Sequence, residues 1–170
     1  MTGAPPDIFL SYNRDDAAVA QTYRDALARE GFVVWWDATL RSGEAYDKVT
    51  EAALRGAKTV VVLWSPRSVD SRWVRAEATI ADRNGTLMLE TIGPCERPVM
   101  FELTQTADLS HWRGDADDKL WRAFLGDVRR MVERVESRQD EAAHASAATA
   151  TAMAARSLPP AQWSAPSPSR

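Results

Sequence analysis

The sequence predicts an α/β protein with an open, mainly parallel five-stranded sheet and helices on both faces. Strand-like and helix-like patterns alternate over the first 135 residues, which is typical of parallel strands joined by crossover helices. Residues 58–64 form a nearly continuous apolar run, as expected of a strand buried on both faces. The chain has 170 residues, of which 45% are apolar and 26% charged, which suits one domain with a real core.

Five segments have the β-branched, aromatic and apolar composition of strands. They are residues 7–11, 32–36, 58–64, 86–92 and 98–103. Turn-forming residues bound several of them, including Gly31 before the second and Asn84-Gly85 before the fourth. We therefore expect five strands in this order along the chain.

Four helices are predicted between and after these strands. They span residues 15–30, 46–55, 71–82 and 117–135. Asp15 or Asp16 can cap the first helix, and Gly31 and Gly56 are stop signals for the first and second. The last helix has apolar residues at helical spacing, from Leu120 to Val135.

The composition divides the chain into three parts. We expect a disordered N-terminus over residues 1–6, a folded domain over 7–136 and a tail or linker over 137–170. The tail contains 11 Ala, 6 Ser and 4 Pro, too little bulky apolar surface to offset its ordering entropy, so disorder is predicted. Residues 141–155, rich in Ala, can be partly helical. Such a linker favours a missing C-terminal sensor or partner domain.

Charge and composition exclude several classes of function. The formal net charge of −3 gives no basic field for nucleic acid. One cysteine and two histidines exclude an internal disulfide, a cysteine-rich zinc site and any site with several imidazoles. No apolar run reaches the ~18 residues that a membrane helix needs, and the N-terminus lacks the pattern of a signal peptide. We therefore expect a cytoplasmic protein without a membrane or nucleic-acid partner.

Common catalytic motifs are missing from the sequence. The predicted first strand is followed by Ser11-Tyr-Asn-Arg-Asp-Asp16, without the glycines of a dinucleotide-binding loop. There is no Walker lysine motif and no nucleophile elbow. The sequence predicts no metal site and no resident cofactor.

In open α/β sheets, ligands bind at the carboxyl ends of the strands, where the strand order reverses. If the order is 2-1-3-4-5, the crevice lies between the first and third strands. Its rim then includes Ser11 to Arg14, residues 37–46 and Trp64-Ser65-Pro66. Trp73 and Glu77 follow on one helix face, one turn apart. From spacing alone, the simpler interpretation is that Trp73 packs in the core and Glu77 is a solvated charge.

Six segments, in this order, resemble a Toll/interleukin-1 receptor (TIR) domain of the bacterial type. They are Asp7-Ile-Phe-Leu-Ser-Tyr-Asn-Arg14, Gly31-Phe-Val-Val-Trp-Trp-Asp37, Gly43-Glu-Ala-Tyr-Asp47, Val61-Val-Leu-Trp-Ser-Pro66, Ser71-Arg-Trp-Val-Arg-Ala-Glu77 and Ala107-Asp-Leu-Ser-His-Trp112. The resemblance covers about residues 7–135. It implies a flavodoxin-like sheet of order 2-1-3-4-5, in agreement with the alternation of elements.

The resemblance also implies an activity, because many bacterial and plant TIR domains hydrolyse NAD+ at the nicotinamide–ribose bond. The product is ADP-ribose or a cyclic isomer of it. The family's catalytic glutamate falls on Glu77, and Trp73 matches an aromatic residue that flanks it. The substrate-binding residues expected from the pocket are Ser11, Tyr12, Arg14, Asp37, Gly43, Tyr46, Trp64, Ser65 and Trp73. NAD+ is then a substrate, and the protein is expected to act in bacterial defence or signalling.

Two other functions stay open from the sequence. Some TIR domains, in animal receptors and adaptors, only assemble with other TIR domains, so this chain can be a non-catalytic scaffold. A small-molecule or nucleotide-binding response domain without chemistry is the second alternative. The family's site is often completed by a neighbouring subunit, so self-association is expected for the enzyme as well as for the scaffold.

Overall fold

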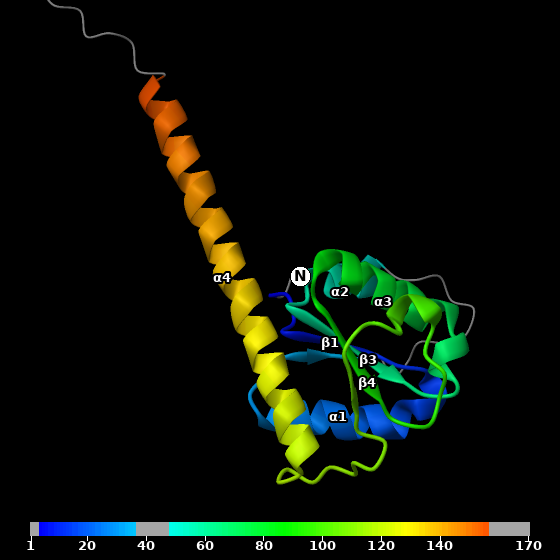
Figure 1. The fold of residues 1–170 in the computed structure, drawn as a ribbon. Coiled ribbons are helices and arrows are strands. Elements are labelled where there is room, and N and C mark those ends of the chain that lie inside the picture. The colour runs from blue at the N-terminus through cyan, green and yellow to red at the C-terminus, as the bar shows by residue number, and fades with distance from the viewer. Residues whose placement is uncertain (1–3, 37–47, 157–170) are drawn as a thin grey trace, which may run out of the picture. The chain divides into compact units, whose positions relative to one another are not determined.

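The computed structural model describes residues 4–36 and 48–156 (Figure 1). Five parallel strands form one sheet in the order β2-β1-β3-β4-β5. The strands are β1 (Ile8–Ser11), β2 (Val34–Trp35), β3 (Thr59–Trp64), β4 (Leu87–Thr91) and β5 (Thr106–Asp108). The α-helices are α1 (Ala17–Arg29), α2 (Lys48–Gly56), α3 (Arg72–Asn84) and α4 (Lys119–Arg156). This arrangement confirms the predicted fold class and strand order.

Strand β3 is central and every residue in it is buried, as its continuous apolar run predicts. Because successive side chains of a strand point to opposite faces, β3 contributes to two separate cores. Val60, Val62 and Trp64 pack with α2 and α3, whereas Val61 and Leu63 pack with α1 and the part of α4 before Ser137. Figure 1 shows α1 on one side of the sheet and α2 and α3 on the other.

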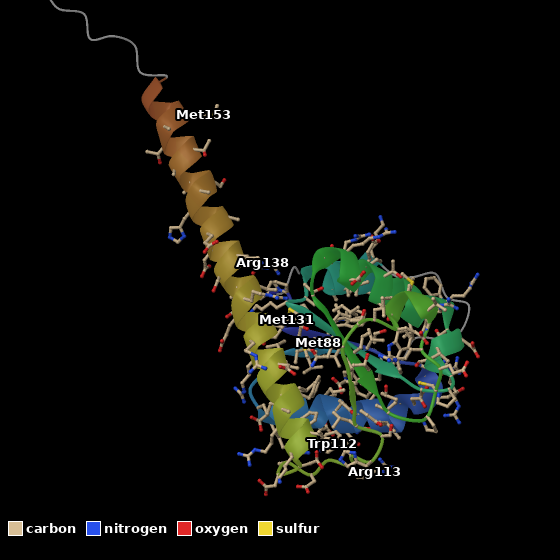
Figure 2. All side chains as sticks on the ribbon, in the orientation of Figure 1. Met88, Trp112, Arg113, Met131, Arg138 and Met153 are labelled. Carbon is tan, nitrogen blue, oxygen red and sulfur yellow. The ribbon has the colours of Figure 1, made fainter. Side chains whose placement is uncertain are left out.

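Aromatic rings fill the core between α1 and α4. Trp112 and Trp121 stack with ring centroids 4.0 Å apart, and Tyr23 of α1 meets the edge of Trp112 at 4.8 Å. Figure 2 labels Trp112, which precedes α4. On the other face, Trp35 stacks on Phe9 at 4.6 Å. These contacts bury Trp112 and Trp121 and partly bury Trp35.

The position predicted for the fifth strand is wrong. Residues 98–103 contain a short 3-10 helix, η3 (Val99–Phe101), and the strand that pairs with β4 is Thr106–Asp108. Only Phe101 of η3 is buried, and Pro98 has no N–H to donate to a sheet. Arg97 secures the connection by donating from Nη1 to the Thr104 carbonyl (3.2 Å) and to Thr106 Oγ1 (2.5 Å).

Both ends of the described chain carry more structure than the composition predicts. Pro6 is buried, and its carbonyl accepts from the Lys58 N–H at 3.4 Å. At the other end, residues 137–156 continue α4 and include the Ala-rich stretch 141–155. Extending an existing helix costs little, and Ala favours it most. The chain divides into two units at Glu136 and Ser137; residues 157–170 lie outside the described part.

Candidate functional site at the carboxyl ends of β1 and β3

Ser11 and Glu77 form the centre of the candidate site. Ser11 is the last residue of β1, beside Val62 of β3 in the sheet register. Its Oγ donates to Oε2 of Glu77 on α3 at 2.5 Å, and both side chains are buried. The hydroxyl holds the carboxylate in one orientation at the carboxyl ends of the strands, where the order of the sheet reverses. The fold therefore places Glu77 at the position where α/β sheets bind ligands.

Trp73 and Glu77 lie one turn apart on α3, and their exposures differ. Trp73 is 45% exposed, whereas Glu77 is only 6% exposed. The simpler interpretation of their spacing, a packed Trp73 and a solvated Glu77, is therefore wrong for both residues. Ser71 begins this helix, with its Oγ accepting from the Val74 N–H at 3.4 Å. A buried carboxylate with an open aromatic one turn before it is unusual for a helix that serves packing alone.

A second polar cluster borders the first. Ser65, directly after β3, donates from Oγ to Oδ2 of the buried Asp16 at 2.5 Å. Arg67 donates from Nη1 to Asp16 Oδ1 at 3.1 Å, and Ser68 Oγ accepts from the Ser65 N–H at 2.7 Å. This network fixes the start of α1 against the loop after β3.

Asp16 was predicted to have a different role, and Arg67 and Ser68 were not among the predicted site residues. Asp16 was a cap candidate for α1, but its side chain makes no capping hydrogen bond. Asn13 caps the preceding turn instead, accepting from the Asp15 N–H at 3.0 Å. The available signal was the polar run Ser65-Pro-Arg-Ser68 immediately after a buried strand.

The other predicted residues fall into three groups. Tyr12 is half-buried with its ring 6.2 Å from that of Trp36, and Arg14 is exposed in the turn after β1. Trp64 is fully buried, with its ring 5.7 Å from that of Phe101, and it packs in the core under α2 and α3. Asp37, Gly43 and Tyr46 lie outside the described residues.

The described residues show neither a metal-binding cluster nor a membrane-spanning helix. In residues 4–36 and 48–156, no cluster of three or more His, Cys, Asp or Glu side chains is arranged to hold a metal ion. Within the same ranges, no helix combines the length and apolar character that crossing a bilayer requires.

The family model for the TIR domain matches residues 8–125. The match spans most of the chain and includes β1, β3, α3 and β5 with the Ser11–Glu77 pair. The chain therefore belongs to the TIR domain family. No curated protein matches it.

Solved structures of TIR proteins share the fold. One is the TIR domain of the Toll-related receptor TRR-2 from Hydra magnipapillata, with a TM-score of 0.61 and 19% identity, covering 73% of this chain and 98% of that one. Another is a metazoan TIR-STING receptor from C. gigas, solved in complex with 2',3'-cGAMP, with a TM-score of 0.54 and 21% identity. That match covers 79% of this chain and 41% of the receptor. At these identities the likeness establishes the fold alone.

Proposed function

We propose that this chain is an NAD+ glycohydrolase that cleaves the nicotinamide–ribose bond, with Glu77 as its catalytic carboxylate. The observation that carries the proposal is the hydrogen bond from Ser11 Oγ to Glu77 Oε2, which orients a buried carboxylate at the ligand-binding end of the sheet. Membership of the TIR family supports it, since that family includes enzymes that cleave NAD+.

One carboxylate is sufficient for this reaction. Ordinary glycosidases need a second carboxyl group as an acid, because their leaving group must be protonated. Nicotinamide leaves a cationic pyridinium as a neutral molecule and takes the electrons of the C–N bond with it. The positive charge passes to the ribose as an oxocarbenium ion, which the negative charge of Glu77 can stabilise.

The second step decides the product. A water molecule that attacks the ribose carbon and loses a proton gives ADP-ribose. Attack by a nitrogen of the substrate's own adenine gives a cyclic isomer. Trp73, 45% exposed and one turn from Glu77, can stack on a planar ring of the substrate and influence this choice.

The test is nicotinamide release from NAD+ by the full chain at high protein concentration, followed by mass spectrometry of the products. Glu77→Gln preserves the shape of the side chain and removes its charge. We expect this variant to lose about a hundredfold or more in rate, as with other groups that stabilise transition-state charge. Glu141→Gln, on an exposed residue of α4, is the matched control and should retain full activity.

Two results would contradict the proposal. Full activity of Glu77→Gln would remove Glu77 from the mechanism. Absence of turnover at every protein concentration, with the fold intact by circular dichroism, would remove the enzymatic function itself.

A second candidate function is assembly with other TIR domains, without catalysis. It is favoured by an exposed apolar surface around η3, where Val99 is 85% exposed and Leu103 is fully exposed. Met100 adds a third exposed apolar side chain. Neighbouring apolar residues of this kind on a surface are typical of protein–protein contacts.

Light scattering of Val99→Glu tests the assembly function. If this surface mediates self-association, the variant should stay monomeric at concentrations where the parent chain forms oligomers. Val33→Glu places the same charge on an exposed valine elsewhere and should behave as the parent. Equal oligomer sizes for the parent and Val99→Glu would exclude this surface as the contact.

A further inference from the structure

A cavity of about 540 Å³ lies between β4, β5 and the part of α4 that precedes Ser137. It is on the opposite face of the sheet from Glu77. Glu90 pairs in register with Leu63, which belongs to the core under α1 and α4, whereas Ser11 pairs with Val62, which belongs to the core under α2 and α3. The volume falls within the range of small-molecule sites, roughly 300–1,000 Å³.

Glu90 is the unusual residue of this cavity. It is 1% exposed and lines the cavity, and its Oε2 has no hydrogen-bond partner among the described residues. Leaving a buried polar atom unpaired costs roughly 1–3 kcal/mol, and more if it is charged. Nearly all such atoms in folded proteins are paired with protein, water or a ligand. The unpaired oxygen of Glu90 is therefore a group that a hydrogen-bond donor bound in this cavity would satisfy.

The electrostatic surroundings favour a cationic donor. Burial raises the pKa of Glu90 well above its usual value, and the negative charges of Asp127 and Asp108 raise it further. Asp127 and Asp108 thus each contribute negative potential at this carboxyl. Two arginines also line the cavity, and each has a partner in the protein. Arg130 is paired with Asp127, and Arg134 donates from Nη2 to the Gly85 carbonyl at 3.3 Å.

The remaining walls suit a flat or compact apolar group. Met88 on β4 and Met131 on α4 both line the cavity (Figure 2). Unbranched, polarizable methionine side chains adapt to ligands of different shape and make favourable contacts with aromatic rings. Ala107 of β5 leaves space beside Glu90, its partner in the sheet register.

We propose that this cavity is a second ligand site, which binds a small organic cation whose charged nitrogen donates to Glu90 and whose apolar body lies between Met88 and Met131. The site is separate from Glu77 and does not rest on the proposed hydrolysis. Tyr23 on α1 offers a further polar group nearby, since burial and the charge of Glu90 both raise the pKa of its hydroxyl, which has no partner among the described residues.

Methyl NMR of the full chain with labelled methionines tests this site. Benzamidinium serves as the cationic test ligand and benzamide as its neutral analogue of the same shape. The chain has five methionines. The methyl resonances of Met88 and Met131 should shift on titration with benzamidinium. Those of Met100 and Met153, which lie outside the cavity lining, should not shift. Benzamide should bind more weakly, because it lacks the charge.

Glu90→Gln provides the decisive comparison. The substitution keeps the shape and removes the ionisable group. At the pH where the parent binds benzamidinium most tightly, we expect the Kd of the variant to be about tenfold higher, the equivalent of about 1.4 kcal/mol. Glu102→Gln removes an exposed carboxylate outside the cavity and should leave the Kd unchanged. Thermal melts of both variants establish that they are folded.

Raising the pH supplies an independent readout. Ionised Glu90 binds a cation more strongly than the neutral acid does, so the affinity for benzamidinium should rise with pH in the parent and stay flat in Glu90→Gln. The charged and titratable groups around the carboxyl are Asp127, Arg130 and Arg134 from α4, Asp108 from β5 and Tyr23 from α1.

An unchanged Kd in Glu90→Gln, equal affinity for benzamide, or no shift at Met88 and Met131 would overturn the proposal and leave a cavity that holds water only.

Discussion

The hydroxyl of Ser65 donates to the buried carboxylate of Asp16 at 2.5 Å, joining two residues that are 49 positions apart in the chain. Ser65 follows β3 and Asp16 precedes α1, so the bond ties together the two segments that flank the switch point of the sheet. Arg67 contributes a charged donor to the other carboxylate oxygen. The network stabilises the loop conformation next to the Ser11–Glu77 pair.

Replacing Asp16 should destabilise the fold. Asp16→Ala leaves the buried Ser65 hydroxyl without its acceptor, and we expect the free energy of unfolding to fall by about 1–3 kcal/mol. Urea denaturation followed by tryptophan fluorescence measures the change. Asp15→Ala, which alters the exposed neighbour, should shift the value by less than about 0.5 kcal/mol. Equal effects for the two variants would show that the Ser65 contact does not stabilise the fold.

The Ser11 hydroxyl should act on catalysis by orienting Glu77. Ser11→Ala removes the donor to Oε2, and we expect kcat for nicotinamide release to fall about tenfold while KM changes little, since the lost contact positions a catalytic group. Ser11→Thr retains a hydroxyl and should recover part of the rate. If Ser11→Ala changed KM alone, the residue would contact the substrate and would not position Glu77.

Glu90 should make the stability of the fold depend on pH. Its pKa in the folded chain lies well above the usual 4.5, because of burial and the charges of Asp127 and Asp108. Below 4.5 the group is protonated in both the folded and the unfolded chain and contributes nothing. Above 4.5 the unfolded chain releases the proton first, so the folded state loses relative stability until the folded pKa is reached.

Glu90→Gln is therefore expected to gain stability over the parent as the pH rises from 4.5. Chemical denaturation at a series of pH values measures the difference. A constant difference between Glu90→Gln and the parent would contradict the assignment.

Lys58 connects three parts of the first unit. Its Nζ donates to Asp7 Oδ1 at 2.7 Å and also to Glu136 of α4. These hydrogen bonds raise the pKa of Lys58 above its usual 10.5, so its contribution to stability is complete below 10.5 and is lost as the pH rises through the higher folded value.

A double-mutant cycle of Lys58→Met and Asp7→Asn should give a coupling of about 1 kcal/mol at neutral pH, since both side chains are largely shielded from solvent. High salt should reduce the coupling only in part. The exposed pair Arg55 and Glu51 on α2 is the reference and should give a smaller, more salt-sensitive value. A coupling of zero for Lys58 and Asp7 would mean that the bond stabilises nothing.

The sequence determined the local elements of this protein. Hydrophobic periodicity depends only on residues that are close in the chain. The sequence therefore predicted the buried run at β3, the apolar stripe of α4 and the alternation of strands and helices. This alternation in turn predicted the parallel sheet. The fifth strand was misplaced because Thr106, Ala107 and Asp108 lack the apolar pattern of a strand. These residues form a strand because they pair with Leu89–Thr91 of β4.

Only the tertiary structure decided which side chains meet. Nothing in the spacing of Ser11 and Glu77, 66 residues apart, shows that they share a hydrogen bond. The usual surface position of charged helix residues predicted a solvated Glu77. Their contact depends on strand order and register, as does the position of Glu90 against a cavity on the other face. Periodicity specifies which face of its own element a residue occupies, whereas its partners depend on how distant elements pack, because burial and hydrogen bonding are set by the whole fold.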